Sequence, residues 1–216
     1  MGAPLAVGGD LEGAEAGGVS APPAPPLLLA STSPQRSAIL GQLGLPFEAV
    51  PPEFQEDDGA DVPPLELVRE HARGKARSVA TRAAPGQPVL GVDTTVVLGG
   101  AVFGKPADAA DAERMLERLG GRTHEVVSGL CLVTPAWEEV VDATTRVTFR
   151  PLAARDLAWY VTLGEWEGRA GGYAIQGRGA ALVERVEGDY LNVVGLPAAA
   201  LVGLLAERFA GTYGYG

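Results

Sequence analysis

The run from Val89 to Leu98 constrains the fold most strongly, because nearly all of its residues are apolar or β-branched. Such a run is typical of a strand whose two faces are both covered by other parts of the chain. Asp93, followed by Thr94 and Thr95, interrupts it. A buried carboxylate must be paired, hydrogen-bonded, metal-bound or neutralised to tolerate its loss of water. Asp93 is therefore a candidate functional residue; the alternative is a structural acid that caps the next loop.

Strands and helices are predicted to alternate through the first half of the chain. Short apolar runs predict strands at 27–30, 47–50 and 89–98, and helical periodicity or capping residues predict helices at 34–43, 65–82 and 108–119. The second half predicts consecutive strands at 125–133 and 139–149, a helix at 153–163, a hairpin of 181–186 with 190–194, and a last helix at 197–209. This order indicates an α/β fold with a mixed sheet.

The chain has 216 residues, 46% of them hydrophobic, which is enough for one substantial core. Residues 1–25 are rich in Ala, Gly and Pro and predict a disordered leader, unless they reflect an upstream mis-start of translation. Residues 26–210 are expected to form a single domain, and 211–216 a flexible tail.

The charge balance limits the possible partners. With 27 Asp and Glu against 17 Lys and Arg, the net charge is -10, which disfavours nucleic acid and anionic membranes. No apolar run approaches the length of a bilayer span, and the N-terminus lacks the pattern of a secretion signal. The single Cys131 excludes an internal disulfide and suits a reducing compartment. We expect a cytoplasmic protein, in which any polyanionic substrate would need a local basic pocket and a metal ion.

The segment from Ser31 to Arg36 follows a predicted strand and opens a helix. Ser33 suits the N-cap and Pro34 the first helical position. Hydroxyls and backbone N–H groups at a helix N-terminus suit phosphate, and Arg36 adds a positive charge. An ordinary capped helix with a solvated arginine is the alternative.

Two lysines and an acidic loop are further candidates. Lys75 falls on the apolar face of the helix predicted at 65–82, so its side chain either extends to the edge of the core or is aimed into a cleft. Lys105 lies between a glycine and a proline that restrict its backbone. The acids of the loop could include a ligand for a hard metal, or could be merely solvated: Glu53, Glu56, Asp57 and Asp58.

The glycine-rich stretch 168–179 contains Tyr173 and Gln176 and could form a loop that recognises a nucleotide base. It does not match a dinucleotide-binding fingerprint, because no strand leads directly into it. His71 and His124 are far apart and lack the spacing of metal ligands, so both are predicted to be structural or exposed.

Four motifs, in this order and spacing, resemble the Maf family of nucleoside triphosphate pyrophosphatases, which are also known as septum-formation inhibitors: Leu29–Arg36, Gly91–Thr94, Gly104–Pro106 and Tyr173–Gly177. The resemblance extends over residues 27–209. It implies a mixed sheet flanked by helices, with two lobes around a deep cleft, as in the related inosine triphosphatase fold. It also implies a possible homodimer.

The resemblance implies roles for the candidate residues. Asp93 would be the catalytic base and a metal ligand, Glu56 a second metal ligand, and the metal Mg²⁺ or Mn²⁺. The substrate would be held by the remaining candidates: Ser31, Ser33, Arg36, Lys75, Thr94, Lys105 and Gln176.

Base preference is also implied by the resemblance. Arg36, Thr94 and Gln176 match the subgroup that acts on dTTP and UTP, although Gln35 stands where many members have a second arginine. The predicted reaction is hydrolysis of dTTP, UTP or modified pyrimidine nucleotides to the monophosphate and pyrophosphate. Two alternatives remain: a nucleotide-binding regulator of cell division with little turnover, and a house-cleaning enzyme for non-standard nucleotides.

Overall fold

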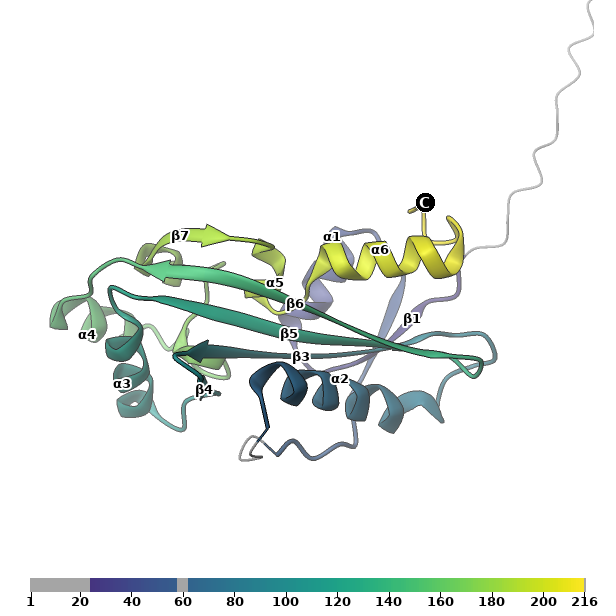
Figure 1. Cartoon of the computed structure of the whole chain (residues 1–216), viewed down its shortest axis with the longest axis horizontal. Coiled ribbons are helices and arrows are strands. Elements are labelled where there is room, and N and C mark those ends of the chain that lie inside the picture. The colour runs from purple at the N-terminus through teal and green to yellow at the C-terminus, as the bar shows by residue number, and fades with distance from the viewer. Residues whose placement is uncertain (1–23, 58–61, 216) are drawn as a thin grey trace, which may run out of the picture.

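The computed structural model describes residues 24–57 and 62–215, so the predicted leader lies almost wholly outside the described residues, as does Asp58. The described chain contains one seven-stranded sheet with the order β2-β1-β3-β5-β6-β7, and β4 pairs with β3 (Figure 1). The strands are β1 (Leu27–Ala30), β2 (Phe47–Val50), β3 (Val89–Leu98), β4 (Ala101–Phe103), β5 (Thr123–Val133), β6 (Glu138–Phe149) and β7 (Val183–Glu187). The helices are α1 (Pro34–Gln42), α2 (Pro64–Ala80), α3 (Ala109–Leu119), α4 (Ala154–Thr162), α5 (Tyr190–Val194) and α6 (Ala198–Phe209).

The sheet is mixed, as predicted. Strand β1 runs parallel to both β2 and β3, whereas β3, β5, β6 and β7 are joined by antiparallel pairings. The long strands β3, β5 and β6 extend along the molecule and connect its two ends (Figure 1). One end carries β1, α1 and α6, and the other carries α3, α4 and β7. Among the described residues, no helix has both the length and the apolar composition needed to cross a membrane.

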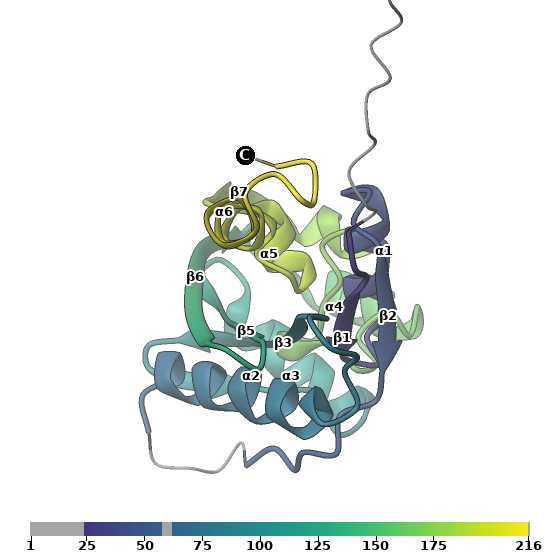
Figure 2. The same ribbon diagram turned by 90° about the vertical axis from the view of Figure 1, so that its right-hand side faces the viewer.

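Each end has its own hydrophobic core, which gives the fold its two lobes. One core joins β1, α1 and α6 through residues such as Leu29, Leu40 and Leu201. The other joins α3, α4 and the C-terminal end of β6 through residues such as Leu116, Tyr160 and Phe149. Helix α2 covers the face of the sheet opposite α5 and α6 (Figure 2).

Two glycines allow α2 to lie directly on β3 and β5. A Cβ atom on Gly91 would be 2.1 Å from the Ala72 carbonyl oxygen, and one on Gly129 would be 2.3 Å from the Val68 carbonyl oxygen. Gly129 is the register partner of Asp93. The close approach therefore occurs beside Asp93 and brings the side chains of α2 within reach of it.

Replacing Gly129 with alanine is expected to lower the free energy of unfolding by about 3 kcal/mol, because the new methyl group would meet helix backbone that cannot move aside. Chemical denaturation measures this change. Gly203→Ala is the matched control, since a Cβ atom there meets nothing within 4 Å. A Gly129→Ala protein as stable as wild type would show that α2 does not need this close approach.

The sequence prediction was wrong at residues 190–194, which form helix α5 and not the second strand of a hairpin. Their β-branched and apolar side chains suggested a strand, but the Asp189 carboxylate accepts hydrogen bonds from the backbone N–H groups of Leu191 and Asn192. This capping starts a helix. Strand β7 pairs with β6 instead.

Two other features were not predicted. Strand β4 forms a short hairpin with β3 through Gly99 and Gly100, whose φ angles are 58° and 84°. After α6, the Tyr213 hydroxyl donates to the Pro25 carbonyl oxygen at 2.8 Å and the Tyr215 hydroxyl donates to that of Leu43 at 2.7 Å. These contacts hold residues of the predicted flexible tail against the domain.

Candidate active site

A cleft of about 480 Å³ is lined by residues from both lobes, a volume within the range of small-molecule sites. Its walls come from the β1–α1 loop, the middle of β3, the loop after β4 and the glycine-rich segment. All nine predicted site residues line it: Ser31, Ser33, Arg36, Glu56, Lys75, Asp93, Thr94, Lys105 and Gln176. The fold thus brings together residues that are widely separated in sequence.

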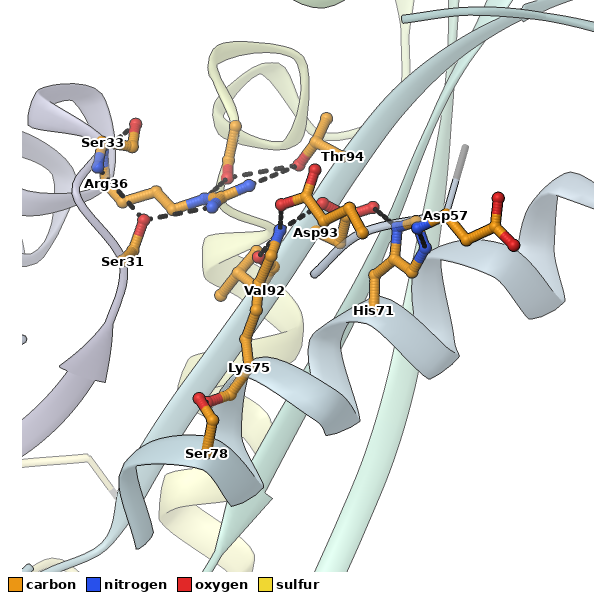
Figure 3. Close-up of polar contacts among 12 residues, drawn as sticks. Ser31, Ser33, Arg36, Asp57, His71, Lys75, Ser78, Val92, Asp93 and Thr94 are labelled. Atoms are coloured by element: carbon orange, nitrogen blue, oxygen red, sulfur yellow. Dashed lines mark hydrogen bonds and ion pairs between the residues drawn. The ribbon is translucent and has the colours of Figure 1, made fainter. Parts of the chain in front are cut away.

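Lys75 lies between two carboxylates at the floor of the cleft. Its Nζ atom is 2.6 Å from Asp93 Oδ1 and 2.6 Å from Glu56 Oε1, and only 7% of its side chain is exposed. Figure 3 shows the Lys75 side chain directed from α2 towards Asp93 on β3. Of the two possibilities for this lysine, the side chain is therefore aimed into the cleft.

His71 makes the second contact with Asp93. Its Nδ1 atom is 3.2 Å from Asp93 Oδ2, and its Nε2 atom accepts a hydrogen bond from the Asp57 backbone N–H at 3.2 Å (Figure 3). The prediction that His71 is structural or exposed did not include this contact. The signal was present in the sequence, because His71 precedes Lys75 by four residues and so shares its helix face.

The pKa of Asp93 reflects these partners. Burial by itself raises it, but hydrogen bonds from His71 and Lys75 and the positive charges of Lys75 and Arg36 outweigh burial. The pKa of the Asp93 carboxyl is therefore held well below its usual range. Asp93 is an ionised carboxylate at neutral pH and a weak proton acceptor.

Arg36 organises the opposite wall. Ser33 caps α1 and accepts a hydrogen bond from the Arg36 backbone N–H. The guanidinium group donates to the Gly195 carbonyl oxygen at 2.9 Å, to Ser31 Oγ at 3.1 Å and to Thr94 Oγ1 at 3.5 Å. The Gly195 contact was not predicted, because 159 positions separate the two residues.

Thr94 is held by the same wall. Its hydroxyl lies 2.8 Å from Ser128 Oγ on β5 and donates to the Gly195 carbonyl oxygen at 3.3 Å. Ser128 was likewise not predicted. These contacts fix the hydroxyl of Thr94 beside the guanidinium group of Arg36.

Lys105 and Gln176 lie on the walls formed by the other lobe. The Gly171 N–H donates to the Gly104 carbonyl oxygen at 3.1 Å, which joins the loop of Lys105 to the glycine-rich segment. The Glu165 carboxylate accepts hydrogen bonds from the backbone N–H groups of Arg178 and Gly179, at 2.8 and 3.3 Å, shortly after Gln176 in the chain. Lys105 is exposed, and no ion pair involves it in the part of the chain that the structure describes.

His124 is 1% exposed and contacts Tyr173 of the glycine-rich segment. Its Nε2 atom is 2.9 Å from the Tyr173 hydroxyl, and its ring packs edge-on against Phe149. Burial lowers the pKa of His124 to about 4. At pH values between this pKa and that of the unfolded chain, only the unfolded chain takes up the proton, so stability falls as pH falls.

Because of His124, we expect the free energy of unfolding to fall by about 2 kcal/mol as the pH is lowered from 7 to 5. Denaturant titrations of wild type and His124→Gln at both pH values measure this contribution as the difference between their pH dependences. The contribution of His71, whose pKa is raised by its hydrogen bond to Asp93, is the same in both proteins and cancels in this difference. Equal pH dependences in the two proteins would contradict a buried, neutral His124.

Glu56, His71 and Asp93 are clustered, with one possible ligand atom from each within 4.8 Å of the others. The two carboxylates fit a hard divalent cation, which prefers oxygen ligands and needs few of them from protein. The ammonium group of Lys75 already binds one oxygen of each carboxylate. A positive charge is therefore stable at this point of the cleft.

Comparison with known proteins agrees with this arrangement. The sequence model of the family described as "Maf-like protein" matches residues 26–208. The chain belongs to the Maf family. Three curated Maf relatives carry the name "dTTP/UTP pyrophosphatase". That of Symbiobacterium thermophilum is 49% identical, over 84% of this chain and 93% of the relative. That of Gloeobacter violaceus is 48% identical, over 84% of this chain and 95% of the relative. That of Deinococcus radiodurans is 44% identical, over 89% of this chain and 97% of the relative.

Proposed function

We propose that this chain is a nucleoside triphosphate pyrophosphatase that hydrolyses dTTP and UTP, or modified pyrimidine nucleotides, to the monophosphate and pyrophosphate. The observation that carries the proposal is the convergence of Asp93, Lys75 and Glu56 with the cationic side chains of Arg36 and Lys105 in one cleft. The activity for which the Maf relatives are named supports the choice of substrates.

In the proposed reaction, water attacks the α-phosphorus and pyrophosphate leaves. Asp93 orients this water, since a carboxylate with a strongly lowered pKa positions a proton donor well and removes its proton poorly. Lys75, Lys105 and Arg36 balance the charge of the phosphates, a contribution that dominates when the transition state spreads charge over oxygen atoms. The hydroxyls of Ser31 and Ser33 lie at the N-terminus of α1, where phosphate is favoured.

We propose Mg²⁺ or Mn²⁺ as the cofactor, held by Glu56 and Asp93. Either cation, when bound, would supply positive charge to the triphosphate and polarise its oxygens. For base choice, we propose Arg36, Thr94 and Gln176, and the hydrogen bond between Arg36 and Thr94 supports a joint role for the first two. Gln35 lines the same cleft but carries no charge.

We further propose a cytoplasmic homodimer. The free, buried Cys131 is consistent with a reducing compartment, and the dimer is proposed from the family resemblance. Light scattering of the purified chain tests the dimer directly.

One assay separates the candidate functions. A panel of standard and modified triphosphates is incubated with Mg²⁺ or Mn²⁺, and pyrophosphate is measured separately from orthophosphate. We expect pyrophosphate to be released fastest from dTTP and UTP. Faster release from modified nucleotides would favour house-cleaning, nucleotide binding without release would favour a regulator of cell division, and orthophosphate alone would contradict attack at the α-phosphorus.

A further inference from the structure

His71 connects the Asp93 carboxylate to the loop that carries Glu56. The imidazole is 3% exposed and lies on α2, one helical turn before Lys75. One ring nitrogen faces Asp93 Oδ2 and the other faces the backbone N–H of Asp57, the residue after Glu56 (Figure 3). The ring therefore bridges two parts of the chain that must be placed together for Glu56 and Asp93 to share one cation.

The direction of these hydrogen bonds follows from the chemistry of the ring. In a neutral imidazole one nitrogen donates and the other accepts. The Asp57 backbone N–H can only donate, so Nε2 accepts and Nδ1 carries the proton, which it donates to Asp93 Oδ2. Since Lys75 binds Oδ1, donors hold both oxygens of the Asp93 carboxylate. A protonated Nδ1 has no lone pair for a metal ion, which distinguishes His71 from the carboxylates beside it.

The loop before α2 also packs on the face of this helix. The ring of Phe54 lies edge-on to His71, with 5.8 Å between ring centroids. A Cβ atom on Gly74 would be 2.2 Å from the Phe54 ring, so the glycine leaves room for the ring against the helix. The contact of Asp57 with His71 therefore belongs to a packed interface between loop and helix.

The same loop is attached at its other end, where the Glu53 backbone N–H donates to Ser78 Oγ at 3.1 Å. Glu56 lies between the two attachment points and reaches Lys75 Nζ at 2.6 Å. The attachment at His71 also contacts Asp93, and Lys75 likewise contacts both Glu56 and Asp93. His71 thus couples the position of the loop to the orientation of the carboxylate.

We propose that His71 is a positioning residue of this site: it orients the Asp93 carboxylate and fixes the loop so that Glu56 and Asp93 face the same cation. The kinetic consequence rests on the proposed function, while the hydrogen-bond geometry does not. The carboxylates must be ordered during the reaction of the bound substrate, so loss of His71 should lower kcat much more than it changes KM.

Kinetics with two substitutions test this role. His71→Leu keeps apolar volume and loses both hydrogen bonds, and we expect kcat to fall by about 10- to 100-fold with KM changed less than about threefold. His71→Asn keeps an N–H group near the position of Nδ1, and we expect it to restore kcat to within about fivefold of wild type. Val79→Ala is the control, because it removes buried volume from the same helix without touching the site; its kcat should stay at the wild-type value.

The ring tautomer gives an independent readout. Nitrogen-15 spectra of the substrate-free protein at pH 8.5 should show His71 protonated at Nδ1, with signals assigned by their loss in His71→Asn. A proton on Nε2 would overturn the proposal, as would wild-type kcat in His71→Leu or an asparagine variant no faster than the leucine variant. If the wild-type chain releases no pyrophosphate, the proposed function fails, and the spectra still decide whether His71 donates to Asp93.

Discussion

Replacing Asp93 with asparagine is expected to lower kcat by about a thousandfold or more, which corresponds to about 4 kcal/mol of transition-state stabilisation. Asparagine has the size of aspartate but no negative charge, so it cannot balance a cation or hold water as an ionised carboxylate does. The lowered pKa of Asp93 means that this charge is present throughout the neutral range. Pyrophosphate release at saturating substrate measures the loss, and circular dichroism confirms that the variant is folded.

The matched control is Asp142→Asn. Asp142 lies on β6 and forms an ion pair with Arg69 outside the cleft. This change removes the same charge from the same sheet, and kcat is expected to stay within about twofold of wild type. If the Asp93→Asn variant were as active as this control, Asp93 would have no role in the reaction.

Replacing Lys75 with methionine is expected to damage both stability and activity. The substitution keeps a similar length but removes the cation between Glu56 and Asp93, so a buried carboxylate is left beside a second one. Breaking a buried pair in this way costs about 3 kcal/mol of unfolding free energy at pH 7. We expect kcat to fall by about 100- to 1,000-fold, because neither carboxylate keeps its orientation.

The pH dependence of this loss has a definite sign. Without Lys75 the pKa of Asp93 rises, and protonation then removes the uncompensated charge. The stability deficit of Lys75→Met should therefore shrink as pH falls from 7 to 4.5, as measured by denaturant titration. Lys105→Met is the control for stability, since Lys105 is exposed and should change only the rate. A deficit that grows at low pH, or no deficit at pH 7, would contradict the role of Lys75 between the carboxylates.

Patterns of apolar and polar residues along the chain were sufficient to predict elements whose formation depends mainly on neighbouring residues. The apolar run of β3 identified a buried strand, and the period of α2 placed Lys75 on its inner face. Residues 190–194 were mispredicted, because their composition favours a strand while the single cap at Asp189 starts a helix. In this segment one hydrogen-bonding side chain outweighed the local preference of five residues.

The missed parts of the site depend on contacts between distant segments. Gly195 and Ser128 meet Arg36 and Thr94 only after the sheet and α5 are assembled. His71 could have been inferred from its four-residue spacing to Lys75, but only with the knowledge that this helix face lies against Asp93. That proximity depends on Gly129, whose lack of a side chain lets α2 approach β5.

The position of bond cleavage tests the central claim most directly. The reaction is run with dTTP or UTP in water enriched in oxygen-18, and both products are analysed by mass spectrometry. Attack of water on the α-phosphorus predicts one labelled oxygen in the nucleoside monophosphate and none in pyrophosphate. Label in pyrophosphate, or release of labelled orthophosphate as the first product, would contradict the proposed reaction at Asp93.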